Sequence, residues 1–532
     1  MVEKREQVGL LPTICLRAQL TIGWTNVEMT ETTANFLAQV ATIAPAAYSR
    51  ESCASILQGH TYVAAGDLER FESQYGALLV RLSARRSTGP SHIHRSLRSL
   101  FRTGSGSSPP VITGFDERRA LVEIYHLLGS AYFSRQWILP DFVLSSHIVL
   151  RCSSIDLAWD TLCDAIGAMV TFGSFGELGS SHGETVLVAN MLRQQYRQSR
   201  LSFIETILAV QSCDLQASDP RDHVYALTAL SNSPPKVPLP DYSMSPVHVF
   251  ASVCRTVNSC LGSPITLALA GLAKEDSNAP LPSWVLNFGV YQQRLLLGHP
   301  VSNFSTSAVP QKSLPDATFD DNEDETLDED DGLDATPKDE DRLKCSGYVV
   351  DTIKAVQSYL PPRRICDQYD MTGDNLFEFV RWYEYACSTE TPRVRYGSDA
   401  LLLRFTEVIQ ARGCNHIWES DQPVPPMQTI SLARAFFAYL DNPQMLRTNA
   451  LRVFVAACLP SHDRRFGLTV RDRFCLIPAN TTPGDLVWVI QGLKVPIVLR
   501  KAGAFYRNVG ECYVEGIMFG EAEGTDEDIT IV

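Results

Sequence analysis

The stretch that most constrains this chain is Asp219–Leu227, because its residue order, Asp-Pro-Arg-Asp-His-Val-Tyr-Ala-Leu, predicts the start of a helix. The Asp219 carboxylate can accept the free amides of a first helical turn, and Pro220 suits the first helical position, where no amide hydrogen is needed. Asp222 then places negative charge at the positive end of the helix dipole. The apolar side chains that follow share one helical face: Val224, Leu227 and Leu230. We therefore expect a helix that begins at Asp219 and packs through that face.

Length and charge limit the classes of function. A chain of 532 residues corresponds to about three domains of roughly 150 residues each. Its content of 45% apolar and 20% charged residues is ordinary for a soluble protein. The net charge is −14, but residues 320–341 alone carry thirteen acidic side chains and one lysine, so the rest of the chain is nearly neutral. Without a large basic surface, we expect neither nucleic acid nor an anionic membrane as a partner.

Two segments have the composition of flexible inserts. Residues 81–110 combine arginines with Gly, Ser and Pro, and Phe101 is the one residue among Phe, Tyr and Trp there that could stack on nucleic-acid bases. A flexible basic loop therefore fits this stretch better than a nucleic-acid site. Residues 301–342 are acidic and rich in Pro, Ser and Thr, and they contain too few apolar groups to offset the entropy of ordering. This composition predicts a disordered acidic linker.

The sequence predicts no membrane span, metal or other cofactor. Apolar runs fall short of the ~18 residues that cross a bilayer, and the N-terminal stretch from Lys4 to Arg17 lacks the cleavage site of a signal peptide. The fourteen cysteines form no Cys-x-x-Cys pair, and Cys414 with His416 is an isolated pairing. Reduced thiols in a cytoplasmic protein are therefore expected.

Hydrophobic periodicity and turn signals divide the chain into four regions. Residues 1–170 alternate helix, short strand and helix, apart from the basic insert near 81–110. Residues 171–300 form a mainly helical region that contains the Asp219 segment, and 301–342 are the acidic linker. Residues 343–532 begin with a strand, continue through helices and end in a small antiparallel β-barrel. The predicted fold class is α+β.

Individual elements follow from the same patterns. The helix predicted after Ser245-Pro246 has a buried stripe of Val249, Phe250, Val253 and Val257. Residues Ile155–Met169 are also predicted to be helical. The predicted barrel strands are Phe474–Pro478, Leu486–Gly492, Pro496–Arg500 and Tyr506–Gly516.

Several separated segments resemble fungal heterokaryon-incompatibility (HET) domain proteins, in the order found in that family. The Asp219–Leu227 segment is similar to the family's Asp-Pro-Arg-Asp-x-Val-Tyr-Ala-Leu signature, and Phe133–Ile138 resembles its Trp/Phe-x-Arg-x-Trp motif. Further similarities, including segments that resemble the C-terminal barrel of larger members, lie at Glu6–Val8, Trp24, Trp159, Asp241–Tyr242, Leu281–Val285, Gly484–Asp485, Pro496–Arg500 and Gly510–Glu521.

The resemblance implies a partial HET-type α/β domain, distantly similar to TIR domains, with a C-terminal barrel. It also implies a cytoplasmic fungal protein of nonself recognition, or vegetative incompatibility, and programmed cell death that acts through contacts with other, unidentified proteins. The family's leading Ser-Tyr-x-Trp-Gly and Cys-Ile-Asn-Gln strands have no counterpart before Glu6, so the chain is interpreted as N-terminally truncated. Helix faces such as that of Phe36 and Val40 are then expected to lack part of their packing partner. An inactive remnant is one alternative.

The other alternative is an enzyme that processes NAD or binds nucleotides in the manner of TIR domains. By loose analogy with a TIR glutamate, Asp141 or Glu123 could be its acid. The preferred interpretation assigns no catalytic, cofactor-binding or metal residue. It treats the motif positions as mainly structural, with a helix cap and an ion pair in the Asp219 segment: Arg135, Trp137, Asp141, Asp219, Pro220, Arg221, Asp222 and Tyr225. The four tryptophans of the motifs are expected in the core or at its rim: Trp24, Trp137, Trp159 and Trp284.

Overall fold

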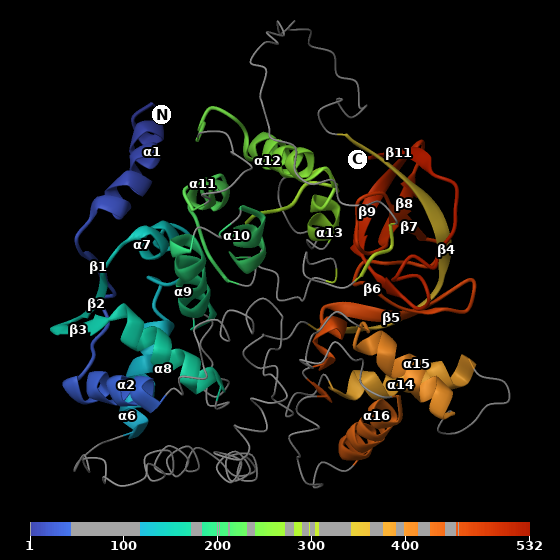
Figure 1. Ribbon diagram of the computed structural model, residues 1–532, viewed down its shortest axis with the longest axis horizontal. Helices are drawn as coiled ribbons and strands as arrows, with labels where there is room; N and C mark the ends of the chain where they lie inside the picture. The colour runs from blue at the N-terminus through green and yellow to red at the C-terminus, as the bar shows by residue number, and fades with distance from the viewer. Residues whose placement is uncertain are drawn as a thin grey trace, which may run out of the picture. The chain divides into compact units, whose positions relative to one another are not determined.

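The chain forms two compact units, each with its own buried core (Figure 1). The first comprises Met1–Pro246, Phe288–Leu297 and Gln357–Phe466, and the second comprises Val247–Asn287, Gly298–Val356 and Gly467–Val532. The computed structural model describes residues 2–43, 117–171, 183–198, 201, 203–210, 213–230, 240–271, 281–289, 297, 304–307, 342–361, 376–389, 398–412, 426–441, 454–455 and 457–532. The predicted basic insert and almost all of the predicted acidic linker lie outside these residues.

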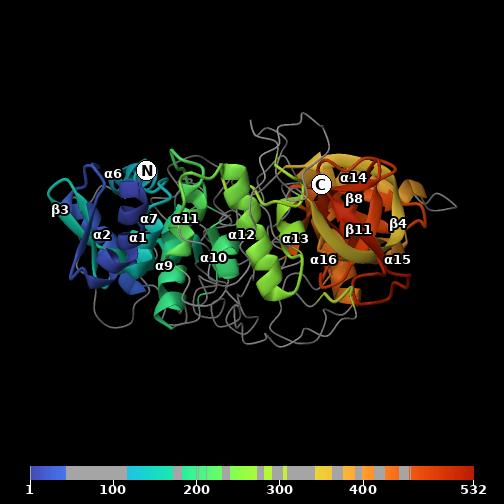
Figure 2. The same ribbon diagram turned by 90° about the horizontal axis from the view of Figure 1, so that it is seen from above.

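A three-stranded sheet with helices forms the N-terminal part of the first unit (Figure 2). Its elements are α1 (Val2–Arg17), β1 (Thr21–Trp24), α2 (Glu31–Ile43), α6 (Glu117–Leu128), α7 (Ile138–Leu144), β2 (Ile148–Cys152), β3 (Ile155–Ala158) and α8 (Trp159–Thr171). The strand order is β1-β2-β3, with β1 parallel and β3 antiparallel to β2. Helices α2 and α8 pack against each other and against the sheet, while α1 packs on α7.

Two expectations for this region need correction. The helix predicted over Ile155–Met169 begins only at Trp159, because the first four residues form β3, where Leu157 points inward and Asp156 pairs with Arg151 of β2 at 2.7 Å. Phe36, expected to lack part of its partner, is fully buried on α2 where that helix meets α8. The exposed large apolar side chains of this region lie instead on α1, on β1 and just before it, and on α6.

Helices make up most of the rest of the first unit. In chain order they are α9 (Gly183–Arg197), α10 (Phe203–Val210), α11 (Asp222–Thr228), α14 (Phe377–Thr389), α15 (Asp399–Ile409), α16 (Pro426–Asp441) and the 3-10 turn Leu459–Ser461. Aromatic rings fill the space between α14, α15 and α16. Tyr383 of α14 lies 5.2 Å from Phe405 of α15, and Phe379 of α14 meets Phe436 of α16 edge-on at 5.9 Å, both measured between ring centroids. These contacts hold the three helices as one packed layer.

The second unit is a closed barrel with two helices, α12 (Pro246–Leu261) and α13 (Thr266–Ala270). Its strands are β4 (Leu343–Leu360), β5 (Arg464–Thr469), β6 (Phe474–Pro478), β7 (Leu486–Ile490), β8 (Ile497–Ala502), β9 (Phe505–Glu511), β10 (Tyr513–Val514) and β11 (Glu527–Ile531). The end of β4 from Gln357 and the start of β5 up to Phe466 fall in the first unit. The order is β10-β6-β5-β4-β11-β9-β8-β7, and β7 also pairs with β4, which closes a ring of five strands. The α+β class and the C-terminal barrel are thereby confirmed, although β11 runs parallel to β9.

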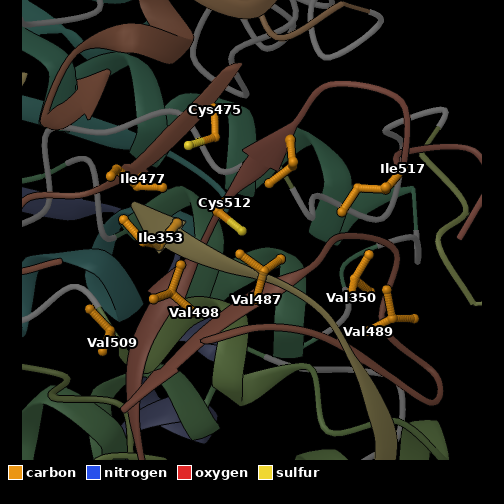
Figure 3. Close-up of a cluster of buried hydrophobic side chains, with 11 residues drawn as sticks. Val350, Ile353, Cys475, Ile477, Val487, Val489, Val498, Val509, Cys512 and Ile517 are labelled. Carbon is orange, nitrogen blue, oxygen red and sulfur yellow. The ribbon is translucent and has the colours of Figure 1, made fainter. Parts of the chain in front are cut away.

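The barrel encloses an apolar core (Figure 3). Its side chains come from several strands: Val350 and Ile353 from β4, Cys475 and Ile477 from β6, Val487 and Val489 from β7, and Val498 from β8. Most of these side chains are β-branched, the type that is favoured in strands. The predicted stripe of α12 is also buried, namely Val249, Phe250, Val253 and Val257.

Candidate functional site

The Asp-Pro-Arg-Asp segment enters its helix through a tight turn. The Asp222 amide donates to the Asp219 carbonyl at 3.0 Å, and the His223 amide donates to the Pro220 carbonyl at 3.2 Å. The Asp219 carboxylate accepts the amide of Arg221 at 3.1 Å. Regular helix therefore begins at Asp222, two residues after Pro220, the predicted first helical position. The aspartate side chain bonds to the amide two residues ahead, as in an Asx turn, which favours a turn over a first α-helical turn.

Arg221 connects this turn to a segment about twenty residues further along the chain. Its guanidinium binds both carboxylate oxygens of Asp219 at 2.9 Å. Its remaining nitrogen donates to the carbonyls of Tyr242 and Met244, each at 2.7 Å. The guanidinium carbon also lies 5.2 Å from the centroid of the Tyr242 ring. A planar group with five donors is suited to such a junction, and a lysine could not make these bonds.

Two tyrosines complete the cluster. The Tyr225 hydroxyl donates to the carbonyl of Asp241 at 2.7 Å and accepts its amide at 3.0 Å. The Tyr242 hydroxyl donates to the buried carboxylate of Asp222 at 2.5 Å. Burial, reinforced by that hydrogen bond and the negative charge of Asp222, raises the pKa of Tyr242, so the phenol keeps its proton. We call these residues the arginine cluster: Asp219, Arg221, Asp222, Tyr225, Asp241 and Tyr242.

The Trp/Phe-x-Arg-x-Trp motif lies beside the arginine cluster. The Gln136 amide donates to the Gln216 carbonyl at 2.9 Å, and the Gln136 side-chain oxygen lies 3.2 Å from Nδ1 of His223. Burial lowers the pKa of His223, against the opposing charge of Asp222, so the ring is neutral at pH 7 and Nδ1 carries the proton it donates. Gln136 and His223, rather than the exposed Arg135 or the half-buried Trp137, therefore join the two motifs.

Asp141 belongs to a different group, on α7. The Cys15 thiol donates to its carboxylate at 3.5 Å. Burial raises the pKa of Asp141, and the Cys15 bond and the charge of Arg135 offset this only in part. Burial and the nearby Asp141 raise the pKa of Cys15 and of Tyr132 to about 12 each. The chemistry available here is that of a carboxylic acid that holds its proton unusually well, next to a thiol that is no nucleophile.

Glu123, the other acid considered, has a structural role. One of its oxygens accepts the Thr30 amide at 2.9 Å, the Thr30 hydroxyl at 2.9 Å and the Thr33 hydroxyl at 2.6 Å, while the other pairs with Arg119 at 3.0 Å. These bonds outweigh partial burial, which alone would raise the pKa, and hold the pKa of Glu123 below its usual range. A carboxylate that accepts four hydrogen bonds fixes the start of α2 to α6.

This arrangement predicts a pH dependence. Because the folded pKa of Glu123 lies below its ordinary value of 4.5, its contribution to the stability of the first unit is complete above that value and is lost as the pH falls through the folded pKa. We expect Glu123→Gln to lower the free energy of unfolding at pH 7 by about 1.5–3 kcal/mol, the range for hydrogen bonds to a charged group. Denaturant titrations of the wild-type and Glu123→Gln proteins at pH 7 and pH 3 measure this difference in the free energy of unfolding. An equal loss at both pH values would contradict the assignment.

Sequence reasoning missed one buried charge that organises the first unit. Arg193 of α9 donates to the carbonyls of Phe142 at 2.8 Å and Ser146 at 2.7 Å, and also to that of Ser145. The sequence does indicate this buried arginine, because Arg193 falls on the same helical face as Val186 and Ala189, at the spacing i, i+3, i+7. A charge on an apolar stripe indicates a partner with several acceptors.

Within the second unit, the predicted landmark Leu281–Val285 binds the barrel. The Ser283 amide donates to the carbonyl of Val532 at 3.1 Å, and the Asn508 amide of β9 donates to the Ser283 hydroxyl at 2.9 Å. The Asn508 side chain donates to the Leu267 carbonyl of α13 at 2.8 Å. A side chain at Gly271 would come within 2.3 Å of the backbone of Gly510. The backbone at the end of α13 is therefore in direct contact with the backbone of β9.

Among the described residues, no three His, Cys, Asp or Glu side chains are arranged to hold a metal ion. No helix in the described part of the chain is long and apolar enough to cross a membrane. No curated protein and no solved structure matches the chain. A family model matches the region of the barrel that follows β4, and the match includes β5 to β10 and most of β11. Residues 444–530 match the family model of the Het-6 beta-barrel domain, a domain associated with heterokaryon incompatibility.

Proposed function

We propose that this chain is a fungal heterokaryon-incompatibility protein that acts in nonself recognition and programmed cell death through contacts with other proteins in the cytoplasm. The observation that carries the proposal is the Het-6 beta-barrel match on residues 444–530. The ordered motifs of residues 1–300, including the arginine cluster, support it. The role proposed for the arginine cluster is structural: it fixes the position of the Asp241–Met244 segment relative to α11. The four-region division of the chain is part of the same proposal.

A cellular experiment tests this role. We expect forced expression of the chain in a filamentous fungus to arrest growth, and we expect Val489→Asp, which buries a charge in the barrel core, to abolish the arrest. Asp141→Asn is the matched variant outside the barrel, and at equal protein level it should preserve the arrest within about twofold. Colony extension and vital staining give the readout. An arrest that survives Val489→Asp would contradict a role for the barrel.

An enzyme that splits NAD is the second candidate, favoured by the environment of Asp141. A carboxyl group whose pKa is raised by burial is a feature of catalytic acids as well as of buried structural acids. Incubating the full-length protein with NAD and following nicotinamide release tests it, with Asp141→Asn and Glu123→Gln compared. Turnover lost on Asp141→Asn but kept on Glu123→Gln would support the enzyme. The preferred proposal predicts no turnover above the rate without protein.

A further inference from the structure

The outer edge of β1 carries backbone groups without a strand beside them in the described part of the chain. In the order β1-β2-β3, strand β1 has a neighbour on one side only. The amide of Thr21 donates to the His147 carbonyl at 2.8 Å, and that of Thr25 donates to the Arg151 carbonyl at 3.2 Å. Backbone groups alternate in direction along a strand, so the N–H and C=O groups of Ile22 and Trp24 point to the outer edge.

The side chains of the same two residues are exposed. Ile22 is 47% exposed and Trp24 is 65% exposed, whereas Gly23 between them is buried. A side chain at Gly23 would come within 2.5 Å of the Tyr132 hydroxyl, so one face of β1 is closely packed. The other face presents a β-branched and an aromatic side chain next to an open hydrogen-bonding edge. Proteins usually protect such an edge with charge, proline or a covering element.

The exposed apolar surface extends along the chain before β1. Four more large apolar side chains are each about half exposed, three on α1 and one between α1 and β1: Leu10, Ile14, Leu16 and Leu20. With Ile22 and Trp24 they leave on the order of 600 Å² of apolar area open, taking roughly 200 Å² for a large side chain. A stable dimer of standard size buries about 800 Å² per partner. The area available on one copy is therefore most of what self-association needs.

We infer that β1 pairs antiparallel with β1 of a second copy of this chain, across a twofold axis at Gly23. This register places Ile22 of one copy opposite Trp24 of the other, and the reverse, as a twofold interface requires. The outward N–H and C=O groups of Ile22 in each copy then bond to the C=O and N–H groups of Trp24 in the other copy. The interface therefore contains two hydrogen-bonded residue pairs. Each pair joins a β-branched residue to an aromatic one on the same face, a favourable cross-strand combination. The two three-stranded sheets become one sheet of six strands.

Sedimentation of the full-length protein between 1 and 100 µM tests the inference. We expect a concentration-dependent species of twice the 59.0 kDa chain mass. Trp24→Lys should raise the dissociation constant of the dimer at least tenfold. Ile22→Pro should do the same, because it removes only an outward donor and leaves the bonds of β1 to β2 in place. Val122→Lys, at a similarly exposed site on α6, is the matched control and should leave the constant unchanged.

Circular dichroism at matched concentration confirms that the variants are folded before they are compared. A wild-type chain that stays monomeric at 100 µM overturns the inference, even if another protein occupies this edge. A dimer that Trp24→Lys and Ile22→Pro both leave intact also overturns it, because the contact then lies elsewhere. Neither result bears on the proposed incompatibility function, which depends on the barrel.

Discussion

Replacing Trp284 by alanine is expected to lower the free energy of unfolding of the second unit by about 3–5 kcal/mol, the usual cost of removing a large buried aromatic side chain. Trp284 is fully buried, and the Arg255 guanidinium lies 5.0 Å above its ring. Its neighbour Ser283 bonds to the barrel, and the Leu286 amide donates to the Cys254 sulfur of α12 at 3.4 Å. The indole therefore supports a segment that contacts both the barrel and α12.

Trp284→Phe is the graded control for this prediction. It keeps an aromatic ring beneath Arg255 and should restore more than half of the lost stability. Denaturant unfolding followed by circular dichroism measures the midpoint of the affected transition. If Trp284→Ala shifted the midpoint no further than Trp284→Phe, the segment would not depend on the filled core position seen in the structure.

The second large effect is expected at Arg193. Arg193→Met keeps most of the side-chain volume but removes the donors to the carbonyls of Phe142, Ser145 and Ser146. A buried acceptor left without a donor costs about 1–3 kcal/mol. With several acceptors affected at once, we expect the first unit to lose about 3 kcal/mol or more, because the end of α7 is no longer held to α9.

Arg197 provides a matched control one helical turn later. It also donates to the Ser146 carbonyl, at 2.9 Å, but from an exposed position. Arg197→Met should therefore cost under about 1 kcal/mol, since water can replace an exposed donor. Thermal and denaturant unfolding of the two variants side by side give the comparison. Equal losses would mean that burial of the Arg193 bonds is not what makes them strong.

The barrel was largely predictable, because several of its strands are short apolar runs separated by glycine turns with positive φ at Gly484, Gly492 and Gly503. Two strands were missed for physical reasons. Strand β11 begins with Glu527 and Asp528 inside an acidic tail. Only Ile529 and Ile531 are buried, and two apolar residues are too few to predict a strand. Strand β5 opens with two arginines, the first of which is completely buried. Both segments form strands because they pair with β4, and the residue pattern of one segment alone carries no information about that pairing.

The candidate site was predictable only where its contacts are local. The Asp219–Arg221 pair lies two residues apart and follows from the motif itself. The contacts of Tyr225 with Asp241 and of Tyr242 with Asp222 span 16 and 20 residues, and nothing in the sequence fixes that distance in space. The same limit hid Arg193, whose acceptors are backbone carbonyls 47 to 51 residues away. Carbonyls carry no sequence signature.

Strand β4 has a consequence for how the barrel is made in the cell. Within the ring it contacts both β7 and β11, and β11 ends at Ile531, far along the chain from where β4 starts at Leu343. Contacts between such distant segments give a high contact order, which slows folding. During synthesis β4 therefore leaves the ribosome well before its partners exist, with an unpaired apolar strand exposed to other nascent chains. Such a strand is a natural client for a chaperone until β11 has been made and has left the ribosome.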